Sequence, residues 1–126
     1  MKNNTNDELQ SVIISENQAF MEDNNPMTMT LKIIGGKWKL TILNRIREEC
    51  PMRFGVLRKK LAHITQATLS MQLKELERDG ILERAAFAET PPRVEYKLTP
   101  IGKELIPIMD ALCDWGRSYQ ESEVKS

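Results

Sequence analysis

TQATLSMQLKELERDG, residues 65–80 of this 126-residue chain, has the pattern of a short amphipathic helix that ends at a glycine. Thr65 suits the N-cap position, where its hydroxyl accepts a hydrogen bond from a backbone N–H, and Gly80 can adopt the left-handed conformation that ends a helix. The leucines of this stretch recur at steps of four and three, which places them on one buried face: Leu69, Leu73 and Leu76. We therefore predict a helix from Gln66 to Asp79.

A second, shorter helix is predicted directly upstream, from about Gly55 to Leu61. It follows a turn at Cys50-Pro51 and a short strand around residues 52–54. The three-residue turn His63-Ile64-Thr65 joins it to the helix that begins at Gln66. Two short helices joined by a three-residue turn form a helix-turn-helix.

Farther upstream, residues 28–49 carry the apolar stripe of another amphipathic helix. Gly35 and Gly36 interrupt it, and each glycine costs a helix roughly 1 kcal/mol relative to alanine, so we expect a break or a close backbone contact there. The linker-like run at residues 23–26 separates this region from an N-terminal arm. In that arm, residues 8–21 have helical spacing with Asp7 as a candidate N-cap.

Downstream of Gly80, residues 81–87 and 94–98 are predicted to be strands joined by residues 88–93. Val94, Tyr96 and Leu98 alternate with charged residues, as a strand with one buried face should. A hairpin that follows a helix-turn-helix is a wing. The predicted fold class is therefore mainly α with a small β-hairpin, a winged helix-turn-helix.

A C-terminal helix is predicted to begin with Thr99 as N-cap and Pro100 at its first position and to run to about Gln120. Its apolar seam is longer than a small domain can cover by itself, so we expect a partner helix and a homodimer. Pro107 lies inside this helix and should bend it. The terminal helices are expected to form the dimer contacts through Leu9, Ile13, Phe20, Leu105, Ile108, Leu112, Trp115 and Tyr119.

These elements divide the chain into four parts. We expect an N-terminal arm over residues 1–25, the winged helix-turn-helix over 26–98, a C-terminal dimerisation helix over 99–121 and a tail over 122–126. Apolar residues make up 40% of the chain and charged residues 29%, an ordinary composition for a globular protein. No stretch approaches the roughly 18 apolar residues of a membrane span, so we expect a cytoplasmic protein with no membrane partner.

The chemistry-bearing residues give no support for catalysis or metal binding. Cys50, Cys113 and the single histidine, His63, have no metal-ligand spacing, and no nucleophile with a base is placed by a motif. We therefore expect no enzyme activity, no metal and no cofactor. The negative end of a helix dipole disfavours a thiolate at Cys50, and Cys113 is predicted to pack as a small apolar residue; redox sensing by either thiol stays open.

The formal net charge is zero, but the charges are segregated. Residues 37–60 hold eight Lys and Arg against two Glu, whereas residues 1–27 hold one Lys against five acidic residues. A local basic surface of this kind suits the DNA backbone.

The face of the 66–79 helix opposite the leucines is small and polar, as any solvated helix face can be. Such side chains can also contact base edges in a major groove: Gln pairs with adenine, and Ser, Thr and Met contact several bases. The N-terminal part of a recognition helix normally reaches deepest. We expect the helix start and this face to supply Thr65, Gln66, Ala67, Thr68, Ser70 and Met71. Contacts to phosphate are expected from Lys37, Lys39, Arg53, Lys74 and Arg78. Arg93, which follows two prolines at the wing tip, is expected to reach a minor groove or the phosphates beside it.

Several motifs occur in an order and spacing that resemble the HxlR-type family of MarR-like regulators. They are IGGKWK at 34–39, RF at 53–54, QLKELERDG at 72–80, PPRVEYKLTP at 91–100 and WG at 115–116. The resemblance covers about residues 26–118. It implies a bacterial winged-helix regulator of transcription that binds double-stranded DNA as a homodimer on a pseudo-palindromic operator. It also implies an effector in many members, either an electrophile, an oxidant or a small metabolite.

This chain departs from the family pattern at two positions. Many relatives have a cysteine directly before the proline that corresponds to Pro26, and here that residue is Asn25. A lysine is frequent where this chain has Ala67. With the zero net charge, Ala67 leaves open an alternative function of a different class, a winged helix that binds an acidic protein partner.

Overall fold

The structure, a computed structural model, describes residues 25–125, which belong to two units divided in the sequence after Gly35. The predicted helix over residues 8–21, and with it the expected dimer contacts of Leu9, Ile13 and Phe20, lies outside the described residues. The first unit contributes α2 (Pro26–Ile34).

Helix α2 is defined by its two ends. The Asn25 side chain accepts a hydrogen bond of 2.8 Å from the backbone N–H of Met27, and Pro26 occupies the first helical position. After the helix, a Cβ added to Gly35 would lie 2.1 Å from the Leu31 carbonyl oxygen, and Gly36 has a φ of 101°. Both positions thus require glycine, and the predicted break at these two residues is confirmed.

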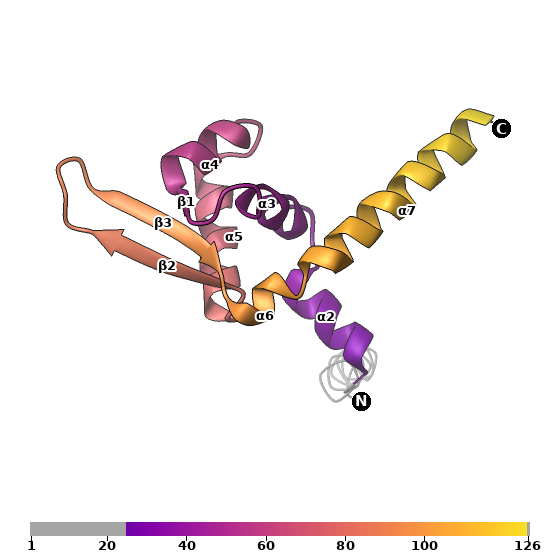
Figure 1. Cartoon of the computed structure of the whole chain (residues 1–126), viewed down its shortest axis with the longest axis horizontal. Helices are drawn as coiled ribbons and strands as arrows, with labels where there is room; N and C mark the ends of the chain where they lie inside the picture. The colour runs from indigo at the N-terminus through magenta and orange to yellow at the C-terminus, as the bar shows by residue number, and fades with distance from the viewer. Residues whose placement is uncertain (1–24, 126) are drawn as a thin grey trace, which may run out of the picture. The chain divides into compact units, whose positions relative to one another are not determined.

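The second unit, described from Gly36 to residue 125, contains a helix-turn-helix followed by a hairpin (Figure 1). Its elements are α3 (Lys39–Ile46), β1 (Met52–Arg53), α4 (Phe54–Lys60), α5 (Gln66–Arg78), β2 (Leu82–Phe87), β3 (Arg93–Leu98), α6 (Pro100–Lys103) and α7 (Ile106–Lys125). The predicted helix-turn-helix corresponds to α4 and α5, and the predicted wing to β2 and β3.

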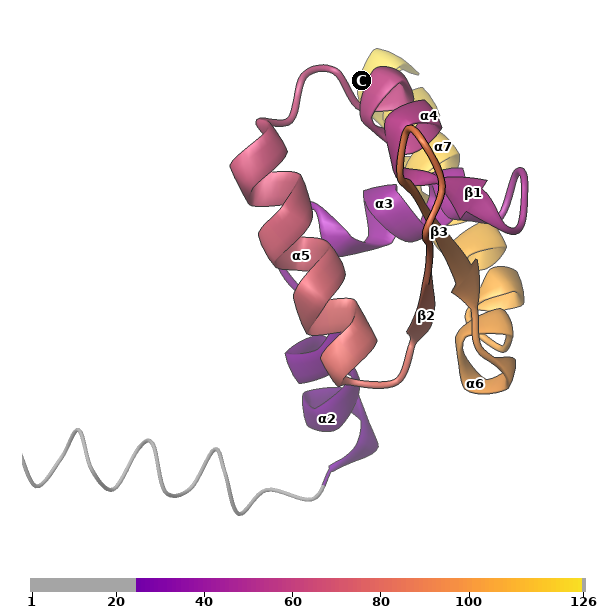
Figure 2. The ribbon, with the colours of Figure 1, turned by 90° about the vertical axis from the view of Figure 1, so that its left-hand side faces the viewer.

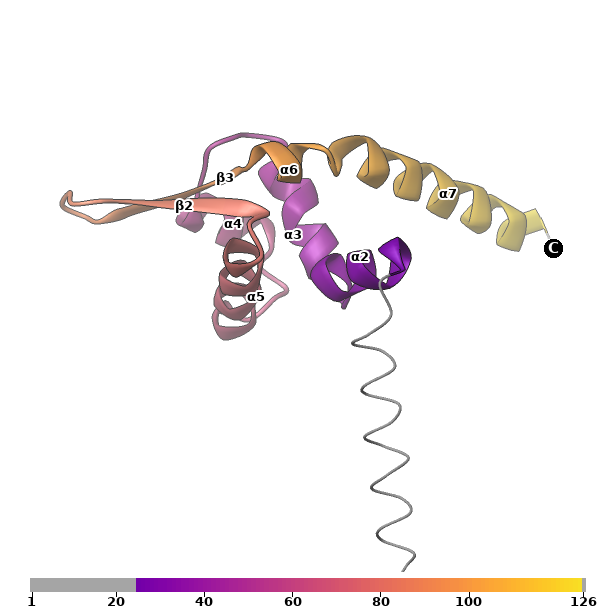
Figure 3. The same ribbon diagram turned by 90° about the horizontal axis from the view of Figure 1, so that it is seen from below.

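The three strands form an antiparallel sheet in the order β1-β3-β2. Leu82 pairs with Leu98 at the base of the hairpin and Phe87 pairs with Arg93 at its far end. Leu82 is the only buried residue of β2, because the rest of this strand extends away from the helices (Figure 3). The hairpin is therefore a solvent-exposed wing with an anchored base.

The core of the second unit lies between α3, α4, α5 and the base of the sheet. Helix α3 contacts both α5 and β3, and α5 also contacts β2 (Figure 2). The buried apolar side chains come from every element around this centre and include Ile42, Leu43, Ile46, Met52, Leu57, Leu61, Ile64, Leu69, Leu73, Leu76, Leu82, Tyr96 and Leu98.

Both ends of α5 have the residues that the sequence predicts. The Thr65 hydroxyl accepts a hydrogen bond of 3.2 Å from the backbone N–H of Thr68, and Gly80 has a φ of 77°. A second threonine joins this end of α5 to the next helix: the Thr99 hydroxyl caps α6 by accepting from the N–H of Gly102, and it donates to the Gly80 carbonyl at 2.6 Å. The turn after α5 is thus bonded to the start of α6.

The prediction of one continuous C-terminal helix from Pro100 to Gln120 is wrong. The structure has two helices, α6 and α7, separated at Glu104-Leu105, and α7 continues to Lys125. Pro107 does not bend a helix from inside. It is the second residue of α7, and in the first turn of a helix a backbone N–H has no helical partner, so proline breaks no hydrogen bond there. Just before α7 the backbone forms tighter turns, in which an N–H bonds the carbonyl three residues earlier, as Leu105 does with Gly102.

Gly102 supplies a test of the packing between α6 and the rest of the unit. A Cβ at this position would lie 2.3 Å from the backbone oxygen of Ile81, so α6 must shift to accept it. We expect Gly102→Ala to lower the free energy of unfolding by about 1–3 kcal/mol, as overpacking usually does, in urea denaturation. Gly55→Ala is the matched control, since nothing lies within 4 Å of its added Cβ. Equal stability of the two variants would contradict the close contact.

Candidate nucleic-acid interface

Helix α5 has one buried and one exposed face. Its three leucines are fully buried, whereas Gln66, Ala67 and Met71 are exposed and Thr68 and Ser70 are half-buried. We call this second set, Gln66, Ala67, Thr68, Ser70 and Met71, the α5 reading face. It lies on the N-terminal half of the helix, the part that a recognition helix presents to base edges.

Two threonines at this end of α5 are occupied in capping the helix. Besides accepting from the N–H of Thr68, the Thr65 hydroxyl donates to the Thr68 hydroxyl at 2.9 Å. Thr65 therefore has a structural role in setting the first turn. Within the α5 reading face, the side chains of Gln66, Ser70 and Met71 take no part in capping the helix, so they are the ones that could contact bases.

The two cations of α5 differ in their surroundings. The Arg78 guanidinium binds the carboxylate of Asp79, with Nε 3.2 Å from Oδ1, and this hydrogen bond raises the pKa of Arg78. Lys74 is exposed and forms no ion pair within residues 25–125. Lys74 is thus the more available cation for a phosphate.

Lys39 does not have the exposure that its predicted phosphate contact needs. The residue is 6% exposed, and its Nζ lies 2.9 Å from Oε1 of Glu75. This ion pair joins α3 to α5 and satisfies the buried charge. Lys39 therefore holds α5 against α3, and its buried ammonium group is not available to a phosphate.

Lys37 lies beside the turn of the helix-turn-helix. Its Nζ is 4.8 Å from the centre of the Trp38 ring, and this ring meets His63 edge-on at 5.4 Å. A cation over an aromatic face is held without neutralising its charge. Lys37 remains exposed and can still reach a phosphate.

Arg93 lies at the last strand pair of the wing and not at its tip. Its guanidinium stacks 4.0 Å from the Phe87 ring, Nη2 lies 3.3 Å from Oε1 of Glu89, and Nε lies 3.4 Å from Oε2 of Glu95. Glu95 also faces Arg53, at 3.9 Å. The structure thus brings together two of the predicted cations, Arg53 and Arg93, around one carboxylate.

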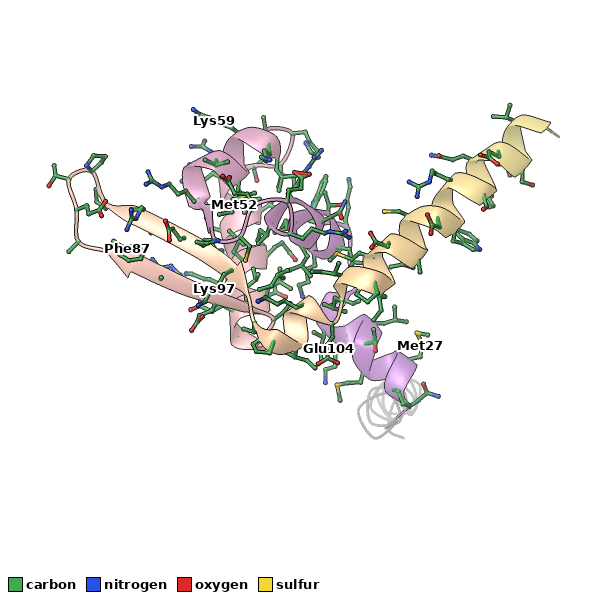
Figure 4. All side chains as sticks on the ribbon, in the orientation of Figure 1. Met27, Met52, Lys59, Phe87, Lys97 and Glu104 are labelled. Atoms are coloured by element: carbon green, nitrogen blue, oxygen red, sulfur yellow. The ribbon has the colours of Figure 1, made fainter. Side chains whose placement is uncertain are left out.

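The cations at the end of α4 were not predicted to contact DNA, although they stand in the basic run of residues 37–60. Lys60 binds Glu48, and the hydrogen bonds from Lys60 and Arg45 lower the pKa of the Glu48 carboxyl. Arg58 and Lys59 are exposed and form no ion pair in the described part of the chain. They line a hollow of about 530 Å³ that also contains Thr65 and Gln66. Figure 4 shows Lys59 on the outer side of α4.

Helix α7 exposes the apolar residues that were predicted to contact a second subunit. Ile108, Leu112, Trp115 and Tyr119, here called the α7 seam, are between 46% and 67% exposed, and Leu105 is half-buried in the link before α7. The rings of Trp115 and Tyr119 stack at 5.4 Å. A different face of α7 packs on the domain, through buried Met109 and through an ion pair of 2.8 Å between Arg47 and Asp110.

The structure corrects one prediction about the two cysteines. Cys50 and Cys113 are both free and exposed, so Cys113 does not pack as a buried apolar residue as predicted. It lines a hollow of about 350 Å³ between α3 and α7.

Within residues 25–125, no three His, Cys, Asp or Glu side chains are grouped for a metal ion, and no helix is long and apolar enough to span a bilayer.

Comparisons with known proteins agree with this geometry. Residues 33–124 match a family model described as HxlR-like helix-turn-helix. An HTH-type transcriptional regulator of Halalkalibacterium halodurans is 45% identical over 97 residues, which cover 77% of this chain and 86% of that protein. The HTH-type transcriptional regulator YdzF of Bacillus subtilis is 45% identical over 91 residues, covering 72% and 84%.

Solved structures show the same likeness. The redox regulator HypR in its reduced form has a TM-score of 0.73 and 38% identity, with 81% of this chain and all of that chain covered. HypR in its oxidised form has a TM-score of 0.68 and 42% identity over 74% and 95%. These relatives are regulators and not enzymes. The chain belongs to the HxlR-like helix-turn-helix family, and it is a transcriptional regulator with a winged-helix DNA-binding fold.

Proposed function

We propose that this regulator acts as a homodimer on a pseudo-palindromic operator, with one α5 inserted into the major groove at each half-site. The observation that carries the proposal is the two-sided character of α5, whose leucines are fully buried while Gln66 and Met71 are exposed. Side chains of this kind suit base edges, since glutamine pairs with adenine and methionine can contact a thymine methyl group.

The proposed contacts divide into two groups. The α5 reading face contacts bases, with Thr65 fixing the first turn. The backbone contacts come from cations around it, which position the protein without conveying sequence: Lys37, Arg53, Lys74, Arg78 and Arg93.

The α7 seam supports the dimer. Four large apolar side chains in a row are exposed on a helix whose other face already packs on α3. A second copy of the same seam is the simplest cover for such a surface. In a dimer of this kind, two recognition helices about 34 Å apart enter successive major grooves.

We further propose that the regulator responds to an effector. HypR is described as a redox regulator, and YodB of Bacillus subtilis has been solved both reduced and diamide-treated. This chain has no thiol directly before Pro26, because Asn25 stands there and its side chain caps α2. Any thiol response of this chain would have to use Cys50 or Cys113.

Selection of bound fragments from genomic DNA tests the function directly. We expect enrichment of fragments that share two inverted half-sites with centres about 34 Å apart. Binding should fall with salt at a log–log slope steeper than about −5, if six or more phosphates are neutralised per dimer. No enrichment, together with a stoichiometric acidic protein partner, would overturn the proposal.

Substitutions in α5 separate base contacts from phosphate contacts. We expect Lys74→Gln to weaken binding to all sequences by a similar factor and to make the salt slope shallower by about one unit per protomer. Gln66→Ala should change the preferred base at one position of each half-site, with a loss of about 1–3 kcal/mol on the original operator. Fluorescence anisotropy on operator and scrambled DNA measures both. A uniform loss in Gln66→Ala would contradict its role in base recognition.

A further inference from the structure

A hollow of about 540 Å³ lies between α4 and the end of the wing. Its walls come from the β1–α4 junction, with Arg53 and Lys59, and from the hairpin loop and the start of β3, with Glu89, Pro91 and Arg93. We call it the wing hollow. Figure 4 shows Lys59 on α4 and Phe87, whose ring carries Arg93, near the far end of β2.

Positively charged side chains outnumber negatively charged ones around the wing hollow. Arg53, Lys59 and Arg93 line it, and Lys59 forms no ion pair with any described residue. Glu95 pairs with Arg93 and, at the longer distance of 3.9 Å, with Arg53. The Glu95 side chain is only 18% exposed, so this carboxylate is a fixed part of the wing.

Glu89 is the second carboxylate that binds Arg93, and it is more exposed than Glu95. It lies in the loop of the hairpin, its side chain is 49% exposed, and its one ion pair in the described chain is with Arg93 at 3.3 Å. Arg93 is held loosely by its two carboxylates, because its Nε lies 3.4 Å from Oε2 of Glu95 but forms no well-aligned hydrogen bond among residues 25–125. Of the two carboxylates that bind Arg93, Glu89 is the more exposed, and ion pairs near the surface contribute at most about 1 kcal/mol, so Glu89 is the one that another anion can replace.

We propose that the wing hollow binds a DNA backbone phosphate, and that Glu89 occupies Arg93 until the phosphate displaces it. A phosphate offers Arg93 charge-assisted hydrogen bonds, and binding releases counterions from the DNA. In this site Lys59 is the cation that has no ion pair among the described residues, and Arg53 supplies a second positive charge. This inference rests on the proposed function, and it adds both a phosphate contact and an internal competitor for it.

Lys59 extends the site toward the recognition helix. It lines the wing hollow and also the hollow that contains Thr65 and Gln66. One side chain therefore borders both the start of α5 and the wing. A phosphate bound at Lys59 would therefore lie between the start of α5 and the wing.

Two charge-matched pairs of variants test the inference by anisotropy on operator DNA over a range of salt. Glu89→Gln is expected to bind about two- to fivefold more tightly per wing at low salt, since it removes the competing carboxylate. Glu83→Gln is its control, because it removes the same charge from the same hairpin, at a residue that pairs with Lys97.

Lys59→Gln should weaken binding to operator and scrambled DNA alike and make the log–log salt slope shallower by about one unit per protomer. Lys103→Gln, on α6, is its control.

The inference is overturned if Glu89→Gln gains no more affinity than Glu83→Gln, or if Lys59→Gln loses no more than Lys103→Gln. It is supported further if the gain from Glu89→Gln disappears when Arg93 is also replaced by Gln, which shows that the two residues act together. Thermal unfolding followed by circular dichroism confirms that each variant is folded. Failure of the proposed function has a different result: the wild-type protein then shows no salt-dependent binding to operator DNA.

Discussion

Trp115→Glu is expected to convert the protein to a monomer and to weaken operator binding by at least about 100-fold, the range lost when two linked binding events become one. Trp115 is 67% exposed and stacks on Tyr119 within the α7 seam. Large aromatic residues near the centre of an interface carry much of its binding energy, and a carboxylate there would be buried unpaired in the dimer. The fold of the subunit should be unchanged, because this side chain is exposed in it.

Light scattering at several protein concentrations and anisotropy on operator DNA measure the two effects. Gln120→Glu is the control, since it adds the same charge on α7 at an exposed position outside the seam. We expect this control to remain dimeric and to bind as the wild type does. A dimeric Trp115→Glu variant would show that the subunits associate through another surface.

Leu73→Ala is expected to lower the free energy of unfolding by about 3–5 kcal/mol, the cost of a cavity that the surroundings fill only in part. Leu73 is fully buried in the middle of α5, where this helix packs against α3 and β2. That loss is a large part of the stability of a small domain. The variant should therefore be partly unfolded at temperatures where the wild type is folded.

Urea denaturation at one fixed protein concentration measures this change, because dimerisation makes apparent stability depend on concentration. Glu77→Ala, an exposed position one turn farther along the same helix, should stay within about 0.5 kcal/mol of the wild type. A similar loss in both variants would contradict the burial of Leu73 as the cause, because alanine is a better helix former than either residue it replaces.

The elements that the sequence predicts correctly are those with local signals at both ends. Helix α5 has a threonine that caps its start and a glycine with positive φ after its end, and both are visible as residue types. The break before α3 depends on Gly35 and Gly36 in the same way. The division between α6 and α7 was missed because Pro107 is compatible with a bend and with a new helix, and the turn bonds of Glu104 and Leu105 decide between them.

The candidate site was less predictable, since Lys39 and Arg53 pair with carboxylates that are far away in the sequence. Lys39 could have been placed correctly from its own helix, because it lies three and four residues before buried Ile42 and Leu43. Its partner Glu75 is 36 residues away and could not be inferred. The partners of Arg93 follow from the hairpin register, in which Phe87 stands opposite it.

The hydroxyl of Thr99 has a mechanical consequence. It bonds the turn after α5 to the first turn of α6, and the Thr99 N–H bonds the Ile81 carbonyl at 3.1 Å, so these segments form one rigid joint. The Glu104-Leu105 link leads from this joint to α7, which is also held to the domain by buried Met109 and by the Arg47–Asp110 ion pair. The helix that carries the exposed seam is thus connected to α5 by two routes, along the chain through the joint at Thr99 and in space through α3.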